Sequence, residues 1–236
     1  MAQTLVSDDG RWWWDGTQWR SRVVEGELEL FWFTTTPEWV TRILITGAIM
    51  LIPIVGVINT YGWTLAATDM VRRRWRELPP AGFHHLERGV RPFVVALVYG
   101  LIAFLVIGSL VATAVLLAIS DHSRIPIAIA MGFLVLLLAL AWWLVVVYLF
   151  AATIVGSDRL GIGRALNPKT LLAITRANRS AALTAGVTYL VASLVLSFAG
   201  TAVGVIVPFG GLVVYLALPA VFALIVPSLA KIEVQP

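Results

Sequence analysis

The chain has no cysteine and unusually few charged residues. Without cysteine it can form neither a disulfide framework nor a catalytic thiolate. Charged residues make up 13% of the sequence, against about a quarter in an average soluble domain. Hydrophobic residues make up 59%, and the mean hydropathy is +0.90. This balance argues against an ordinary soluble domain and indicates a chain that lies mostly in lipid.

Several long segments carry no charge at all. The stretch from Phe93 to Ile119 is the clearest, because no polar stripe of helical period can be drawn along it. A helix needs about 20 apolar residues to cross the hydrocarbon layer of a bilayer. The sequence therefore predicts an all-α integral membrane helical bundle with four full transmembrane helices. These are expected at about 93–119, 126–155, 181–207 and 210–230.

A further hydrophobic segment, at about 40–71, is interrupted by Pro53 and Gly56. Proline removes a backbone donor and clashes with the preceding turn, so a kink or a break is expected here. Two geometries remain open: one kinked span, or two half-helices that enter and leave on the same side as a re-entrant hairpin. Pro53, Gly56 and Asn59 are the candidate hinge and intramembrane polar residues. Asn59 suits either a hydrogen bond between helices or a solute site.

Basic residues concentrate in two loops, at 72–92 and 157–180. Such an excess is typical of cytoplasmic loops, so these loops and the C-terminus are predicted to be cytoplasmic in a multi-pass protein of the cell (plasma) membrane. Basic side chains near a bilayer attract anionic lipid headgroups. The candidate headgroup-binding residues are Arg72, Arg73, Arg74, Arg76, Lys169, Arg176 and Arg179. No basic block typical of nucleic-acid binding is present.

The second basic loop contains a predicted amphipathic helix at about 167–178. Asn167 is suited to the N-cap and Pro168 to the first turn. Leucine and isoleucine side chains would enter the membrane interface while the basic side chains meet the headgroups. We therefore predict an interfacial helix.

The side of the polar N-terminal region, residues 1–38, depends on the interrupted segment. If that segment crosses once, the region lies outside; if it is re-entrant, the region is cytoplasmic. The sequence favours the cytoplasmic side, because no secretory signal precedes the segment and a broken helix suits re-entry.

Within this region, residues 11–20 read as a tryptophan-rich β-hairpin. Asp15-Gly16 is a strong signal for a two-residue turn, which would place Trp12 opposite Trp19. Trp12, Trp14 and Trp19 would then share one face. That face could dock a partner protein, or it could stabilise a tail that lies at the membrane interface, where tryptophan is favoured.

Two stretches resemble known families. The string "GRWWWDGTQWRSRV", within residues 10–24, resembles domain of unknown function 2510, found near the N-termini of many actinobacterial membrane proteins. The segment "LIPIVGVINTYG", followed by the arginine run and "LPPAGFHHLERGVRPFVVAL", resembles the prokaryotic membrane family domain of unknown function 4013. The second resemblance covers roughly residues 39–230 in layout and implies no established activity.

No arrangement typical of an enzyme is found in the sequence. A carboxylate pair, a nucleophile with its base, or a metal-ligand cluster would be expected. The sequence therefore predicts no enzyme, no cofactor and no metal site. It predicts a non-catalytic interaction or membrane-organising component. The alternative is a small permease or channel subunit for a neutral or apolar solute, using the interrupted segment.

Overall fold

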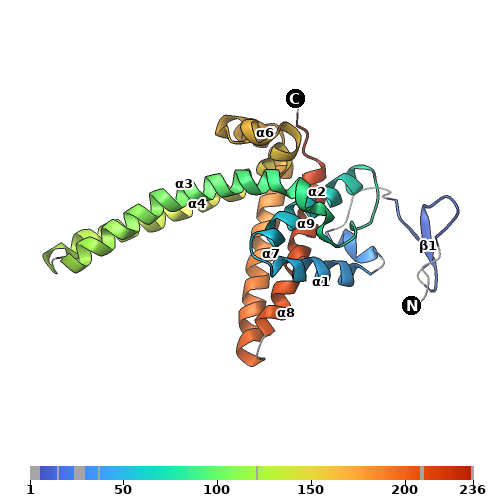
Figure 1. The fold of residues 1–236 in the computed structure, drawn as a ribbon, viewed down its shortest axis with the longest axis horizontal. Helices are drawn as coiled ribbons and strands as arrows, with labels where there is room; N and C mark the ends of the chain where they lie inside the picture. Colours follow the sequence, from blue (N-terminus) through green and yellow to red (C-terminus); the bar gives the residue numbers. More distant parts are fainter. Residues whose placement is uncertain are drawn as a thin grey trace.

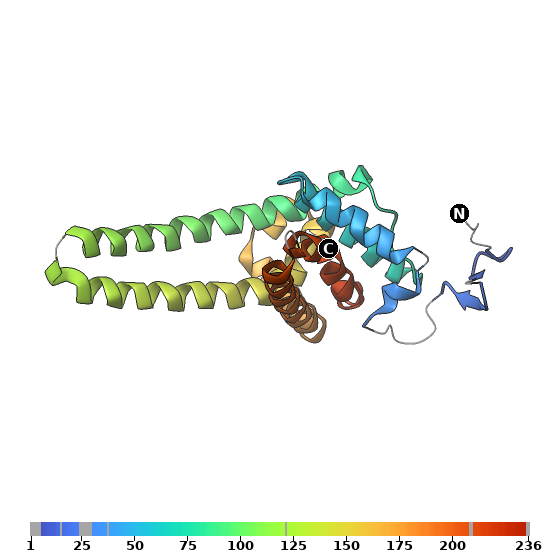
Figure 2. The same ribbon diagram turned by 90° about the horizontal axis from the view of Figure 1, so that it is seen from below.

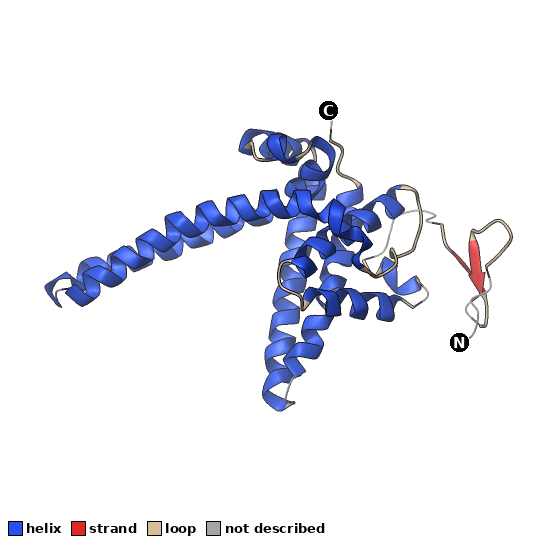
Figure 3. Cartoon of the chain, in the orientation of Figure 1, coloured by secondary structure: helices blue, strands red, loops and turns tan. Residues whose placement is uncertain are grey.

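The computed structural model describes residues 6–14, 16–23, 30–36, 38–120, 122–207 and 210–234. A two-stranded antiparallel sheet at the N-terminal edge precedes a helical body (Figure 3). The strands are β1 (Trp12–Trp14) and β2 (Trp19–Ser21). The helices are α1 (Trp39–Met50), α2 (Val55–Arg72), α3 (Leu86–Ser120), α4 (Ile125–Leu160), α5 (Ile162–Ala165), α6 (Pro168–Ala177), α7 (Arg179–Ile206), α8 (Gly210–Leu216) and α9 (Leu218–Ala230). Short 3₁₀ turns lie at Trp32–Thr35, Phe83–His85 and His122–Arg124.

Four helical segments are long and apolar enough to cross a membrane. They are Phe83–Ser120, Ile125–Leu160, Arg179–Ile206 and Gly210–Ala230, and 18-residue stretches within them have mean hydropathies of 2.7, 2.8, 2.0 and 2.4. Large side chains on the first and third of these segments point outward: Phe104 is 72% exposed, Phe198 73% and Val205 82%. Apolar surface on this scale is unfavourable in water and favourable in lipid. The prediction of four potential membrane-spanning helices is confirmed.

The long helices form two pairs that diverge. The α3–α4 pair extends to one side, whereas α7 and α8 extend in another direction from the same junction (Figures 1 and 2). The distal halves of these helices therefore do not pack into one common bundle. The distal halves carry apolar side chains, and lipid chains solvate such surfaces as well as another helix would. Nothing in their composition holds the two pairs together.

The interrupted segment folds as a helical hairpin. Helix α1 ends at Met50, and α2 begins at Val55 after a turn in which Ile54 has a φ of +67°. The two helices approach each other so closely that a Cβ atom on Gly56 would lie 2.3 Å from the Cα of Met50. Glycine at this position therefore lets the chain reverse within a few residues.

The two ends of the α1–α2 hairpin are hydrogen-bonded to each other. Before α1, the Thr36 hydroxyl donates to the carbonyl of Arg76 at 3.1 Å and accepts from the amide of Leu78 at 3.2 Å. Within α1, the Arg42 guanidinium also donates to the carbonyl of Leu78. The chain therefore enters and leaves this hairpin on the same side of the protein.

The buried core centres on α2, α4 and α9. Trp63, Ile225 and Leu229 are fully buried there. Trp32 and Phe33, each 3% exposed, join this core, and the Trp32 indole donates to the carbonyl of Ala223 at 3.0 Å. The end of the polar N-terminal region thus packs into the helical domain, because these aromatic side chains bury more apolar area than a solvated linker could.

The sheet has a different register from the one expected. Trp14 pairs with Trp19, Trp13 with Arg20, and Trp12 with Ser21. The connection is therefore four residues long, and the two-residue turn prediction is wrong, with Asp15 itself outside the described residues. The observed register sets the Trp14 and Trp19 rings edge to face, with centroids 5.7 Å apart, an arrangement that aromatic pairs favour.

Candidate functional site

A charged cluster joins α2, α3 and α4 where the apolar segments end. Arg88 donates to both oxygens of Asp158, with Nε–Oδ1 at 2.9 Å and Nη2–Oδ2 at 2.8 Å. Arg88 Nη1 also lies 2.8 Å from Asp69 Oδ2, and Arg159 Nη2 lies 3.0 Å from Asp69 Oδ1. Two carboxylates and two guanidinium groups therefore neutralise one another across three helices.

The sequence pattern favours a local ion pair of Asp69 with Arg72 or Arg73, three and four residues later. The contact between Asp69 and Arg72 is present but long, at 3.6 Å. The stronger partners come from helices far along the chain and carry no local signal. For this cluster the sequence offers one signal: Asp158 is a carboxylate at the start of a basic loop.

The Arg72 side chain is hydrogen-bonded to the end of α9. Its guanidinium donates to the carbonyls of Ile232 at 2.9 Å, Ala230 at 3.3 Å and Leu229 at 3.4 Å. These carbonyls lie in and just after the last turn of α9, where a cation also matches the helix dipole. Arg72 thus closes the last apolar helix.

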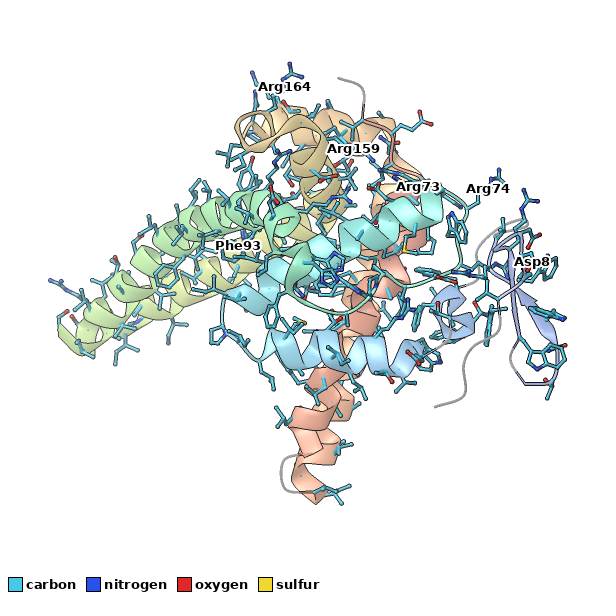
Figure 4. All side chains as sticks on the ribbon, turned by 45° about the vertical axis from the view of Figure 1, so that its right-hand side comes forward. Asp8, Arg73, Arg74, Phe93, Arg159 and Arg164 are labelled. Carbon is cyan, nitrogen blue, oxygen red and sulfur yellow. The ribbon has the colours of Figure 1, made fainter. Side chains whose placement is uncertain are left out.

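The other candidate headgroup-binding residues are more accessible. Arg76 is half-buried, and its backbone bonds to residues before α1. The remaining candidates are exposed: Arg73, Arg74, Lys169, Arg176 and Arg179. Figure 4 shows Arg73, Arg74, Arg159 and Arg164 along one edge of the molecule, the edge that carries α6. Both basic loops therefore contribute to one face, which we call the basic edge.

Helix α6 is amphipathic in the structure. The Asn167 side chain accepts from the amide of Lys169 at 3.0 Å, so it caps the helix start. Leu171 and Ile174 are buried against α4, whereas Lys169 and Arg176 are exposed. The helix therefore has an apolar face and a basic face, but its apolar face packs into the protein. The expectation that these leucine and isoleucine side chains enter the membrane interface is wrong for Leu171 and Ile174, which belong to the core.

The tryptophan hairpin is exposed and anchored at its base. Trp12 is 39% and Trp19 48% exposed, and Trp14 is half-buried against Trp19. Arg22 forms an ion pair with Glu77 and lies 5.3 Å from the ring centroid of Trp75. The hydrogen bond to Glu77 raises the pKa of the Arg22 guanidinium. These contacts fasten the hairpin to the loop that follows α2.

The hinge candidates fall in two environments. Pro53 lies in the exposed turn between α1 and α2, and Gly56 is buried at the start of α2. Asn59 is fully buried, and neither its amide nitrogen nor its amide oxygen has a hydrogen-bond partner among the described protein groups. Buried polar groups without partners are rare.

Two cavities lie where α4 meets its neighbours. The larger, about 340 Å³, lies among α2, α3, α4, α6 and α7, and it is lined by Tyr61, Tyr99, Trp142, Phe150 and Tyr189 among others. The smaller, about 250 Å³, lies between α4 and α7 and shares Val146, Phe150 and Tyr189 with it. Neither cavity is lined by Pro53, Gly56 or Asn59.

Metal-binding side chains do not gather in this part of the protein. Among the described residues, no group of three or more His, Cys, Asp or Glu side chains is placed to hold a metal ion.

Four apolar helices, a basic edge and an exposed apolar surface define a polytopic α-helical membrane protein. The chain belongs to the DUF4013 family, described as a protein of unknown function, whose profile matches residues 45–209. No curated protein and no solved structure matched the chain. The family match begins after the tryptophan hairpin, so the resemblance of residues 10–24 to domain of unknown function 2510 stays a prediction.

Proposed function

We propose that this protein is a non-catalytic component of the membrane that recruits a partner protein through its tryptophan hairpin. The observation that carries the proposal is the attachment of the hairpin to the basic edge. Arg22 pairs with Glu77, and the amide of Arg76 donates to the carbonyl of Arg22 at 2.7 Å. The exposed faces of Trp12 and Trp19 are thus held in a defined place.

We further propose that the α1–α2 segment is re-entrant. Its two ends are joined through Thr36, Arg76 and Leu78, which supports entry and exit on one side of the bilayer. The tryptophan hairpin then lies on the same side of the bilayer as both basic loops. By the excess of positive charge in those loops, that side is the cytoplasm.

The non-catalytic role is supported by the way the charged groups are used. Asp69, Asp158, Arg88 and Arg159 satisfy one another, and Arg72 binds backbone carbonyls. A catalytic acid or base needs access to a substrate, and these groups are committed to holding helices together. The permease alternative gains no support, because Asn59 is sealed in the core and neither described cavity includes it.

A crosslinking experiment tests the docking role. A photoreactive amino acid replaces Thr17, which is exposed in the loop between β1 and β2. In cells we expect a discrete protein adduct that is lost in the double variant Trp12→Ala/Trp19→Ala, because large exposed aromatic side chains dominate protein interfaces. Phe83→Ala, which removes another half-exposed aromatic side chain far along the chain, is the control and should keep the adduct.

Crosslinking of Thr17 to lipid alone would contradict the docking role and favour a tail that lies at the membrane interface. Truncations are a poorer test if they extend past residue 30. They would remove Trp32 and Phe33, which belong to the core.

A further inference from the structure

We propose that the larger cavity is a binding site for one acyl chain of an anionic phospholipid, whose headgroup lies at the start of α6. The site lies away from the tryptophan hairpin, so it does not depend on the docking role. Its volume of about 340 Å³ falls in the range of small-molecule sites, about 300–1,000 Å³.

The walls of the cavity suit an apolar group. They are formed mainly by aromatic and aliphatic side chains of α3, α4, α6 and α7. Two of the polar side chains among them are already engaged: the Tyr99 hydroxyl donates to the carbonyl of Leu166 at 3.0 Å, and the Thr153 hydroxyl donates to the carbonyl of Leu149 at 3.0 Å. A ligand that needed several hydrogen bonds would lose more on desolvation than it gained here.

The cavity adjoins lipid. It lies where the α3–α4 pair separates from α7, and Gly100 on its wall is exposed. A Cβ atom added to Gly100 would meet no atom within 4 Å. A lipid chain can therefore enter from the side, between helices whose outer surfaces are already in contact with lipid.

The charge at the cavity's edge specifies the headgroup. Pro168 lines the cavity, and the next residue is the exposed Lys169. Ala165, whose carbonyl accepts from the Tyr99 hydroxyl at 3.5 Å, is preceded by the exposed Arg164. The carboxylate of Asp158, at the end of α4, is held by Arg88. Phosphate on a lipid whose chain fills the cavity would meet two positive charges.

The test uses the full chain in nanodiscs with a phosphatidylglycerol that carries a diazirine on its acyl chain. After photolysis, labelled peptides are identified by mass spectrometry, and phosphatidylcholine with the same chain is run in parallel. We expect phosphatidylglycerol to label peptides of α3, α4 and α6 that line the cavity. Phosphatidylcholine should label them several-fold less.

Two glycine variants test whether the chain occupies the cavity. Gly100→Leu places a side chain in the open space, and labelling of the cavity peptides should fall about fivefold or more. Gly108→Leu is the matched control: it lies on the same helix, its Cβ also meets nothing within 4 Å, and it does not line the cavity. Circular dichroism and the elution profile confirm that both variants fold.

A charge variant tests the headgroup. In Arg164→Gln/Lys169→Gln, the several-fold preference for phosphatidylglycerol should be lost, while labelling by phosphatidylcholine is unchanged. Equal labelling by the two lipids with the native chain would overturn the proposal. So would labelling spread evenly over the exposed faces of α3, α4 and α7, or an equal effect of the two glycine variants.

Discussion

At the scale of single residues, arginines with the same charge have different structural roles. The Arg72 guanidinium donates hydrogen bonds to three backbone carbonyls, whereas the side chain of Arg73, the next residue, is exposed. A hydrogen bond that involves a charged group contributes about 1.5–3 kcal/mol, and partial exposure reduces this value. Position on the helix, and not charge alone, decides which arginine supports the fold.

We therefore expect Arg72→Gln to lower the free energy of unfolding by about 1–2 kcal/mol, because the last carbonyls of α9 lose a charged donor. Arg73→Gln should change it by less than about 0.5 kcal/mol. Unfolding of the purified protein in mixed detergent micelles measures both. Equal effects of the two substitutions would show that Arg72 acts only as a surface charge.

At the scale of elements, the folding of the first hydrophobic segment depends on glycines that bring backbones together. A Cβ atom on Gly62 would lie 1.9 Å from the carbonyl oxygen of His85, and one on Gly89 would lie 1.7 Å from that of Ile58. Helices α2 and α3 therefore cross in backbone contact. Glycine is the only residue that fits at these positions unless the helices separate.

We expect Gly89→Ala to destabilise the protein by about 1–3 kcal/mol, because backbone atoms cannot move aside as a flexible side chain would. Gly108→Ala, further along α3 where a Cβ meets nothing, should be neutral or slightly stabilising, since alanine is the better helix former. The same unfolding assay compares them. A neutral Gly89→Ala variant would mean that α2 and α3 are not in close contact.

At the scale of the whole molecule, the α1–α2 hairpin brings the N-terminal region next to the first basic loop. Its ends meet at Thr36 and Leu78, the tryptophan hairpin is fastened at Glu77, and the basic edge adjoins both. The connection between α3 and α4 lies at the far tip of that pair (Figure 2). The proposed re-entrant geometry therefore places the tryptophan hairpin, both basic loops and the C-terminal segment on one side of the membrane.

Because the chain has no cysteine, single-cysteine variants can map this arrangement. With a maleimide that does not cross membranes, we expect Ser123→Cys, between α3 and α4, to be labelled in intact cells. Thr17→Cys, in the tryptophan hairpin, and Ser180→Cys, in the second basic loop, should be labelled only after permeabilisation. Labelling of the Thr17→Cys and Ser123→Cys variants together from outside would mean that residues 39–71 cross the bilayer.

Much of the architecture follows from sequence because its cause is local. The free energy of moving a segment into lipid depends on that segment's own side chains, so the four apolar helices can be located without knowing their neighbours. Asn167 and Pro168 likewise act within one turn, and α6 begins where they predict.

What the sequence by itself determined is the class of protein, the apolar helices and the basic loops, since each depends on residues close together in the chain. Only the tertiary structure decided that Asp69 and Asp158 share Arg88, that Trp32 and Phe33 enter the core, and that the cavity lies beside α6. These features join segments far apart in the chain. Their energy comes from shape and charge that fit only when the helices are packed, so no single stretch of sequence encodes them.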